Sequence, residues 1–214
     1  MNSDEIARIS GLSRQSDFSA FIVAHPNGTG EAKSWNRVHD VGFTRALPDE
    51  LSGLVNPDAS GVYATGFPKG AIFVYRIAAV APVAAKQIRD DQNACRPART
   101  MPIIHFHVPS DVLNPYAGGM TSAGFQILPV EEAVAFWVEL DACEIQVETA
   151  QSGNVRRDVH APCAQGAAIE LYTIVGGEHA WPGGEAVSPQ IGEPTKETNA
   201  SAWMREFFAA HPMP

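Results

Sequence analysis

Two polar loops in this sequence each carry a residue suited to proton transfer. The first loop follows an apolar run at residues 101–107 and contains the carboxylate of Asp111. The second follows the apolar run 168–175 and contains His179 within the glycine-rich block 176–184. A loop imidazole can move protons near neutral pH, and a neighbouring carboxylate can hold its orientation. Taken alone, Asp111 is more often an ordinary turn or cap residue and a loop histidine more often a solvated side chain, so an acid–base pair is one of two interpretations of these residues.

A tight turn precedes both loops along the chain. It is bounded by Gly66 and Gly70 and lies between an expected strand at 61–65 and a helical stretch. This is the layout of a nucleophile elbow, where flanking glycines give room for a strained turn that exposes a serine. The central residue here is Pro68, which has no nucleophilic oxygen and a fixed φ of about −65°. We expect Pro68 to begin the following helix, where its missing N–H is no loss.

The order of turn, aspartate and histidine is the chain order of the α/β-hydrolase triad. The sequence also resembles the esterase family that includes polyhydroxybutyrate depolymerase-like and feruloyl esterase proteins. The most specific match is the Gly-Gly-x-His-x-Trp-Pro-Gly-Gly block at residues 176–184. Further matching stretches lie at residues 21–23, 26–28, 40–43, 62–66, 81–84, 104–107 and 170–172.

The resemblance implies a role for four residues. Asp111 would be the triad acid, His179 the base, and Trp181 would line a pocket for an aromatic group or cap the core. Pro68 stands at the serine position. The family's first strands, and the His-Gly turn that supplies an oxyanion donor, have no counterpart in this sequence. We therefore expect a truncated α/β-hydrolase fold with impaired ester hydrolysis.

Two interpretations of the activity stay open. In the first, the chain is a carboxylic-ester hydrolase that uses another nucleophile, for which Thr65 and Ser110 are the nearest hydroxyl candidates. In the second, it is a non-catalytic pseudo-enzyme or remnant that binds a small ester or phenolic ligand. We favour the second for present activity, because neither hydroxyl occupies the exposed elbow position.

Apolar runs and helical patterns alternate along the whole sequence. Strands are expected at residues 20–24, 61–65, 78–83, 101–107 and 168–175. Continuous apolar strands between helices predict an α/β fold with a mostly parallel sheet covered by helices on both faces. Gly and Pro are spread evenly, without a linker or repeat, so we expect one domain over residues 1–214.

Three segments carry the clearest helical patterns. Residues 130–140 are apolar on most of their circumference and follow Pro129. Near the C-terminus, apolar residues recur with helical spacing after the capping candidates Thr198 and Asn199. A third helix is expected to start at Asp40, with an apolar stripe and an interruption at Pro48. Its stripe consists of Phe43, Leu47, Leu51 and Leu54.

Other potential ligands are few. Of the three cysteines, Cys143 and Cys163 bracket an expected β-hairpin, so they are either a disulfide across it or two buried thiols, while Cys95 stands apart. His105 and His107 share one face of a strand and offer half of a metal site, but no third ligand has a matching spacing. We expect a structural role for them, and no cofactor or metal.

Charge and hydropathy narrow the range of partners. The formal net charge is −9 and the sequence has no cationic block, which disfavours nucleic acid and anionic membranes as partners. No apolar run reaches the length of about 20 residues that spans a bilayer. The acidic start of the chain is unlike a secretory signal, so as written we expect a cytoplasmic protein. The sequence does not indicate an oligomeric state.

Overall fold

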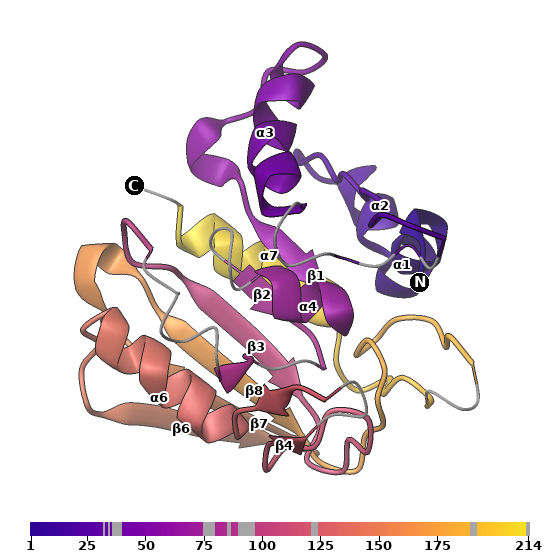
Figure 1. Ribbon diagram of the computed structural model, residues 1–214. Helices are drawn as coiled ribbons and strands as arrows, with labels where there is room; N and C mark the ends of the chain where they lie inside the picture. Colours follow the sequence, from indigo (N-terminus) through magenta and orange to yellow (C-terminus); the bar gives the residue numbers. More distant parts are fainter. Residues whose placement is uncertain are drawn as a thin grey trace.

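Six strands form the central sheet of the molecule (Figure 1). The computed structural model describes residues 1–31, 33, 35, 40–74, 80–84, 87–89, 97–120, 124–188 and 192–212. In sheet order the strands are β1 (Ala64–Gly66), β2 (Val80–Pro82), β3 (Ile103–His107), β8 (Ile169–Ile174), β7 (Val155–His160) and β6 (Val147–Ser152). The pairs from β1 to β8 are parallel, and β7 and β6 continue the sheet in antiparallel pairing.

Helices and a small second sheet surround these strands. The helices are α1 (Ser3–Ser10), α2 (Leu12–Ser16), α3 (Asp40–Ser52), α4 (Lys69–Val74), α6 (Val130–Leu140) and α7 (Ala200–Ala210), with 3₁₀ turns at Ala59–Gly61 and Ala164–Gly166. The second sheet pairs β4 (Gly119–Met120) with β5 (Gln126–Ile127). None of the helices in the described ranges is long and apolar enough to cross a membrane.

The sheet has a hydrophobic core on each face, because side chains alternate between faces along a strand. On one face α7 packs against β3 and β8, through Met204, Phe207, Ile104, Phe106, Tyr172 and Ile174. On the other face α6 packs against the same strands, through Val130, Val134, Trp137, Ile103, Ile169 and Leu171. Every residue of β3 is buried, as expected of a strand covered on both sides. The predicted α/β class, with a mostly parallel sheet and helices on both faces, is confirmed.

Two of the expected strands differ from the structure. Residues 21–28 belong to no helix or strand, so the strand predicted at 20–24 is wrong. Val23 packs on the core but Ile22 is 60% exposed, and the run pairs with no strand among the described residues. The strand predicted at 61–65 is shifted, since Asp58 caps the 3₁₀ turn before it and pairing begins at Ala64. Of the strand predicted at 78–83, residues 78 and 79 lie outside the described residues.

Two of the three predicted helices agree with the structure, and the third differs in part. The segment 130–140 forms a helix over the same residues, and Asn199 caps α7 by accepting a hydrogen bond from the N–H of Ala202 at 3.0 Å. The third helix starts at Asp40 as expected, but it continues through Pro48 instead of being interrupted. Its predicted stripe does not face a core, because α3 stands away from the sheet (Figure 1) and Phe43 is 49% exposed.

The predicted hairpin before the last strand is present and carries a disulfide. Strands β6 and β7 pair over six residues each around a two-residue turn whose Gly153 has a φ of 56°. Cys143 and Cys163, before and after the hairpin, are joined by a disulfide. Of the two predicted possibilities, a disulfide or two buried thiols, the structure therefore contains the disulfide. Cys95 lies outside the described residues.

Candidate functional site

The loop after β3 holds the carboxylate of Asp111 in a fixed position. One oxygen, Oδ1, accepts hydrogen bonds from the backbone N–H groups of Leu113 and Asn114, at 2.9 and 2.7 Å. The amide of Asn114 donates to the carbonyl of Ala84 at 2.6 Å, which ties this loop to the end of the neighbouring strand. Aspartate favours such turns because its side chain accepts from the backbone two or three residues ahead. The second oxygen, Oδ2, remains available for another partner.

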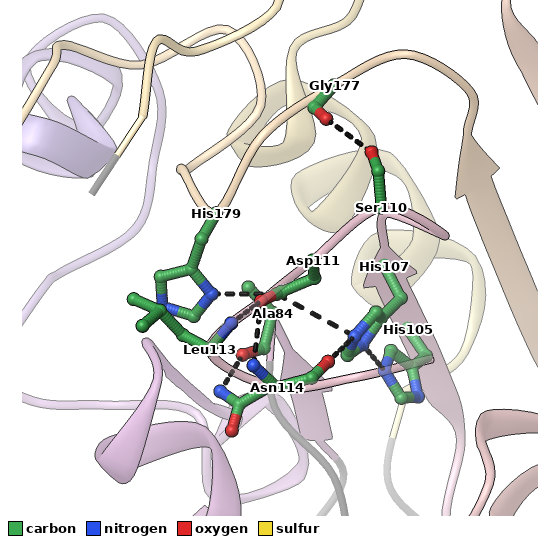
Figure 2. A network of polar contacts seen from close by, with 9 residues as sticks. All are labelled: Ala84, His105, His107, Ser110, Asp111, Leu113, Asn114, Gly177 and His179. Atoms are coloured by element: carbon green, nitrogen blue, oxygen red, sulfur yellow. Dashed lines mark hydrogen bonds and ion pairs between the residues drawn. The ribbon is translucent and has the colours of Figure 1, made fainter. Parts of the chain in front are cut away.

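That partner is His179, in the glycine-rich loop after β8. Its Nδ1 lies 2.7 Å from Oδ2 of Asp111, and both residues are 3% exposed (Figure 2). The hydroxyl of Ser110 donates to the carbonyl of Gly177 at 2.9 Å and joins the two loops a second time. Because a carboxylate accepts the bond, Nδ1 of His179 is the donor. Residues 68 positions apart thus form the arrangement of an orienting acid and a base.

A second imidazole lies on the far side of the same carboxylate. Nε2 of His107 is 2.9 Å from the carbonyl oxygen of Asn114 and 3.8 Å from Oδ2 of Asp111 (Figure 2). Nδ1 of His107 lies 3.3 Å from Nε2 of His105, so the two histidines do share one face of β3. Across the described ranges, no group of three or more His, Cys, Asp or Glu side chains is arranged to hold a metal ion. The pair instead extends the buried polar network around Asp111.

The glycine-bounded turn has the predicted layout of strand, turn and helix. Strand β1 ends at Gly66 and α4 begins at Lys69, one residue later than the expected start at Pro68. A Cβ on Gly66 would lie 2.4 Å from the carbonyl carbon of Gly70, so only glycine allows this close approach. The ring of Phe67 packs against the ring of His179, with centroids 4.9 Å apart. The turn therefore lies against the base, as it does in an α/β-hydrolase elbow.

The candidate nucleophiles near the turn are engaged elsewhere. The hydroxyl of Thr65 donates to the carbonyl of Ala81 at 2.6 Å. Ser110 donates to Gly177 and is exposed. Within the part of the chain that the structure describes, neither hydroxyl is hydrogen bonded to His179. The geometry thus pairs a carboxylate with an imidazole, and neither of the two candidate hydroxyls in the described ranges serves that imidazole.

Trp181 lies in the hydrophobic core. It is 1% exposed, its ring edge contacts Phe67 with centroids 6.5 Å apart, and its Nε1–H donates to Oγ of Ser201 at 2.9 Å. This position matches the alternative in which it caps the core, and no face of its ring is open to a ligand. Trp181 contacts the site only through Phe67, whose ring packs against His179.

Several residues of the site were not indicated by the sequence. Phe67 contacts the pair only because the fold brings three strand ends together, and no local signal marks it, whereas His107 was expected to be structural but its place beside Asp111 was not indicated. Asn114 did carry a signal, since an Asp-x-x-Asn segment is typical of a turn capped by its own aspartate. The roles of Asp111 and His179 themselves stay predictions, now with a geometry that fits them.

Sequence comparisons agree with this geometry at the level of a broad class. The chain is 27% identical to a putative esterase, NocK, from Nocardia uniformis subsp. tsuyamanensis, over 86% of this chain and 63% of that protein. It is 30% identical to feruloyl esterase B from Piromyces equi, over 66% of this chain and 29% of that protein. The chain is a distant relative of esterases. It spans less than two thirds of the length of either relative, and no protein-family model matches it.

Proposed function

We propose that this chain is a carboxylic-ester hydrolase of the polyhydroxybutyrate depolymerase and feruloyl esterase type whose catalysis is impaired because Pro68 stands at the nucleophile position. The observation that carries the proposal is the buried bond of 2.7 Å between Nδ1 of His179 and Oδ2 of Asp111, beside the turn after β1. Strand-end loops are where an α/β-hydrolase places its acid, base and nucleophile. The distant esterase relatives support the same class.

Asp111 can orient His179 as a base, but these two residues alone cannot start acyl transfer. In the hydrolase mechanism Nε2 of the histidine takes the proton of the attacking hydroxyl, and the carboxylate stabilises the imidazolium that results. Pro68 has no hydroxyl to give up that proton, so the covalent step lacks its attacking atom. Loss of a triad member leaves only the residual rate from transition-state hydrogen bonds and binding.

A second candidate function is binding without turnover, and the packing of Phe67 favours it. This side chain is 5% exposed and covers the imidazole of His179, which is itself almost fully buried. A base that must meet substrate is normally reached from solvent, whereas this one lies under an aromatic ring. A pseudo-enzyme that retains a small ester or phenolic ligand is consistent with that closure.

The deciding experiment is hydrolysis of p-nitrophenyl acetate and methyl ferulate by purified wild type, Pro68→Ser and His179→Ala. The proposal expects a silent wild type and a measurable rate for Pro68→Ser that is lost when His179→Ala is added. His211→Ala serves as the control for background hydrolysis by an ordinary imidazole. A wild type that turns over, reacts with a fluorophosphonate and loses activity in His179→Ala contains a hidden nucleophile, and the impairment proposal is then wrong.

A further inference from the structure

A groove of about 660 Å³ lies away from the Asp111 and His179 pair, between α2, the start of α7 and the loop at 183–184. Its size falls within the range of about 300–1,000 Å³ that small-molecule sites occupy. The loop wall is set by backbone packing, because a Cβ on Gly184 would lie 2.0 Å from the carbonyl oxygen of Ile9. A wall fixed in this way is preformed, and binding to it costs little rearrangement.

The groove is cationic in a strongly acidic protein. Two of its lining residues are Arg14 and Arg205, and none is acidic, although the whole chain carries a net charge of −9. Arg14 is held in place by Glu185, whose Oε1 lies 3.1 Å from its NH1. Arg205 has only Glu206, at 3.7 Å, and makes no hydrogen bond to the described residues. Both guanidinium groups keep N–H donors for a further anion.

An apolar ring completes the groove beside these cations. Phe18, just after α2, lines it and is 91% exposed. At the edge of the groove its ring offers an apolar surface beside the two guanidinium groups. Ser10 and Asn199 also line the groove, but Oγ of Ser10 already accepts from the N–H of Leu12, and Oδ1 of Asn199 from the N–H of Ala202.

We propose that this groove binds a small organic anion whose carboxylate or phosphate oxygens pair with Arg14 and Arg205 while its flat apolar body lies on Phe18. Guanidinium groups match the geometry of both oxyanions and bind them with charge-assisted hydrogen bonds. The two arginines set the charge of the ligand, and the aromatic ring sets its shape. This proposal is independent of ester hydrolysis, since none of these residues touches the Asp111 and His179 pair.

The test is isothermal titration of the full chain with benzoate, phenyl phosphate, benzyl alcohol and acetate. Saturable binding is expected for one or both of the aromatic anions, and their relative affinity identifies the preferred oxyanion. Neutral benzyl alcohol and the ringless acetate are each expected to bind more weakly. Arg205→Gln should weaken the aromatic anion by about tenfold or more, and Phe18→Ser by about threefold or more.

The matched control is Arg89→Gln. Arg89 is as exposed as Arg205, at 45%, but pairs with Glu132 on α6, away from the groove, so the affinity should not change. Arg205 and Phe18 are exposed, so their variants should keep the wild-type circular dichroism spectrum. Failure of both aromatic anions to bind overturns the proposal. So does equal binding of benzyl alcohol, or an Arg205→Gln variant that binds as wild type does.

Discussion

The ring of Phe67 lies on the imidazole of His179, with the two ring centroids 4.9 Å apart and the planes tilted by 35°. Phe67 neighbours Pro68 in the turn, so the residue at the proposed nucleophile position and the ring that covers His179 belong to one short segment. Substitution of Phe67 changes the access to His179 without supplying a nucleophile, so the two can be tested separately.

Shortening the cover should expose the base. We expect His179 to react with diethyl pyrocarbonate more slowly than the half-buried His25 and His211 in the wild type and distinctly faster in Phe67→Leu. This substitution should cost no more than about 1.5 kcal/mol of unfolding free energy. Peptide mapping by mass spectrometry measures the rate at His179 itself. Phe207→Leu, equally buried at 5% but packed elsewhere, is the control and should leave that rate unchanged.

The two glycines of the turn should respond oppositely to alanine. A Cβ on Gly66 would lie 2.4 Å from the backbone of Gly70, so Gly66→Ala should lower the unfolding free energy by about 1–3 kcal/mol or more. Gly70 lies in α4, and a Cβ on it would meet only Nε1 of Trp35, at 3.8 Å. Gly70→Ala should therefore be neutral or stabilising by up to about 1 kcal/mol. Urea denaturation compares the two, and equal losses would show that the turn is not tightly packed.

Asp141 should make the stability depend on pH in an unusual direction. Burial raises the pKa of its carboxyl to about 6, although a hydrogen bond from the N–H of Met101 partly opposes the rise. The folded state then binds the proton more tightly than the unfolded state, so the stabilisation by the neutral acid is present below pH 4 and is lost as pH rises to about 6. The loss attributable to this group is up to about 3 kcal/mol.

The measurement is the unfolding free energy of wild type and Asp141→Asn between pH 4 and 7.5. The difference between the two proteins isolates this carboxyl from all other titrating groups, and it should shift in favour of the variant as pH rises. Asp49→Asn, at an exposed position on α3, should track the wild type throughout. A constant difference between wild type and Asp141→Asn would mean that the carboxyl titrates normally.

The disulfide between Cys143 and Cys163 should contribute measurably to stability. It closes a loop with a sequence separation of 20 residues, and constraint of the unfolded chain by such a loop is worth about 3 kcal/mol. Dithiothreitol should lower the denaturation midpoint of the wild type but not of Cys143→Ser/Cys163→Ser. If the reductant affected both proteins alike, the loss would come from another source.

The contact between Asp111 and His179 could be predicted because the sequence signals for both residues lie close to them in the chain. Asp111 and His179 each follow an apolar strand, and their order with the glycine-bounded turn matches a known triad. Parallel strands then bring such loops to one edge of the sheet, so the contact followed from the topology. The helix at 130–140 was predictable to the residue, because its pattern is apolar nearly all round and the proline before it marks the start.

The remaining elements depend on contacts that local patterns do not encode. The run at 20–24 has strand-like residues but pairs with no described strand, since pairing depends on what lies beside it. The stripe from Phe43 to Leu54 has helical spacing, yet α3 extends away from the sheet. Phe67 illustrates the same limit in the site, because its contact with His179 spans more than a hundred residues of chain.

The first and last parts of the chain are joined by the hydrogen bond from Oγ of Ser201 to the carbonyl of Ser10, across 191 positions of sequence. The same junction includes the bond of 3.1 Å from the N–H of Glu185 to the carbonyl of Ile9. During synthesis, α1 and α2 leave the ribosome long before α7 exists. The apolar side chains of Ile9 and Leu12 share a core with α7, so they stay without these partners until the 191 positions between Ser10 and Ser201 have been synthesised, and this part of the core is a late, non-local step of folding.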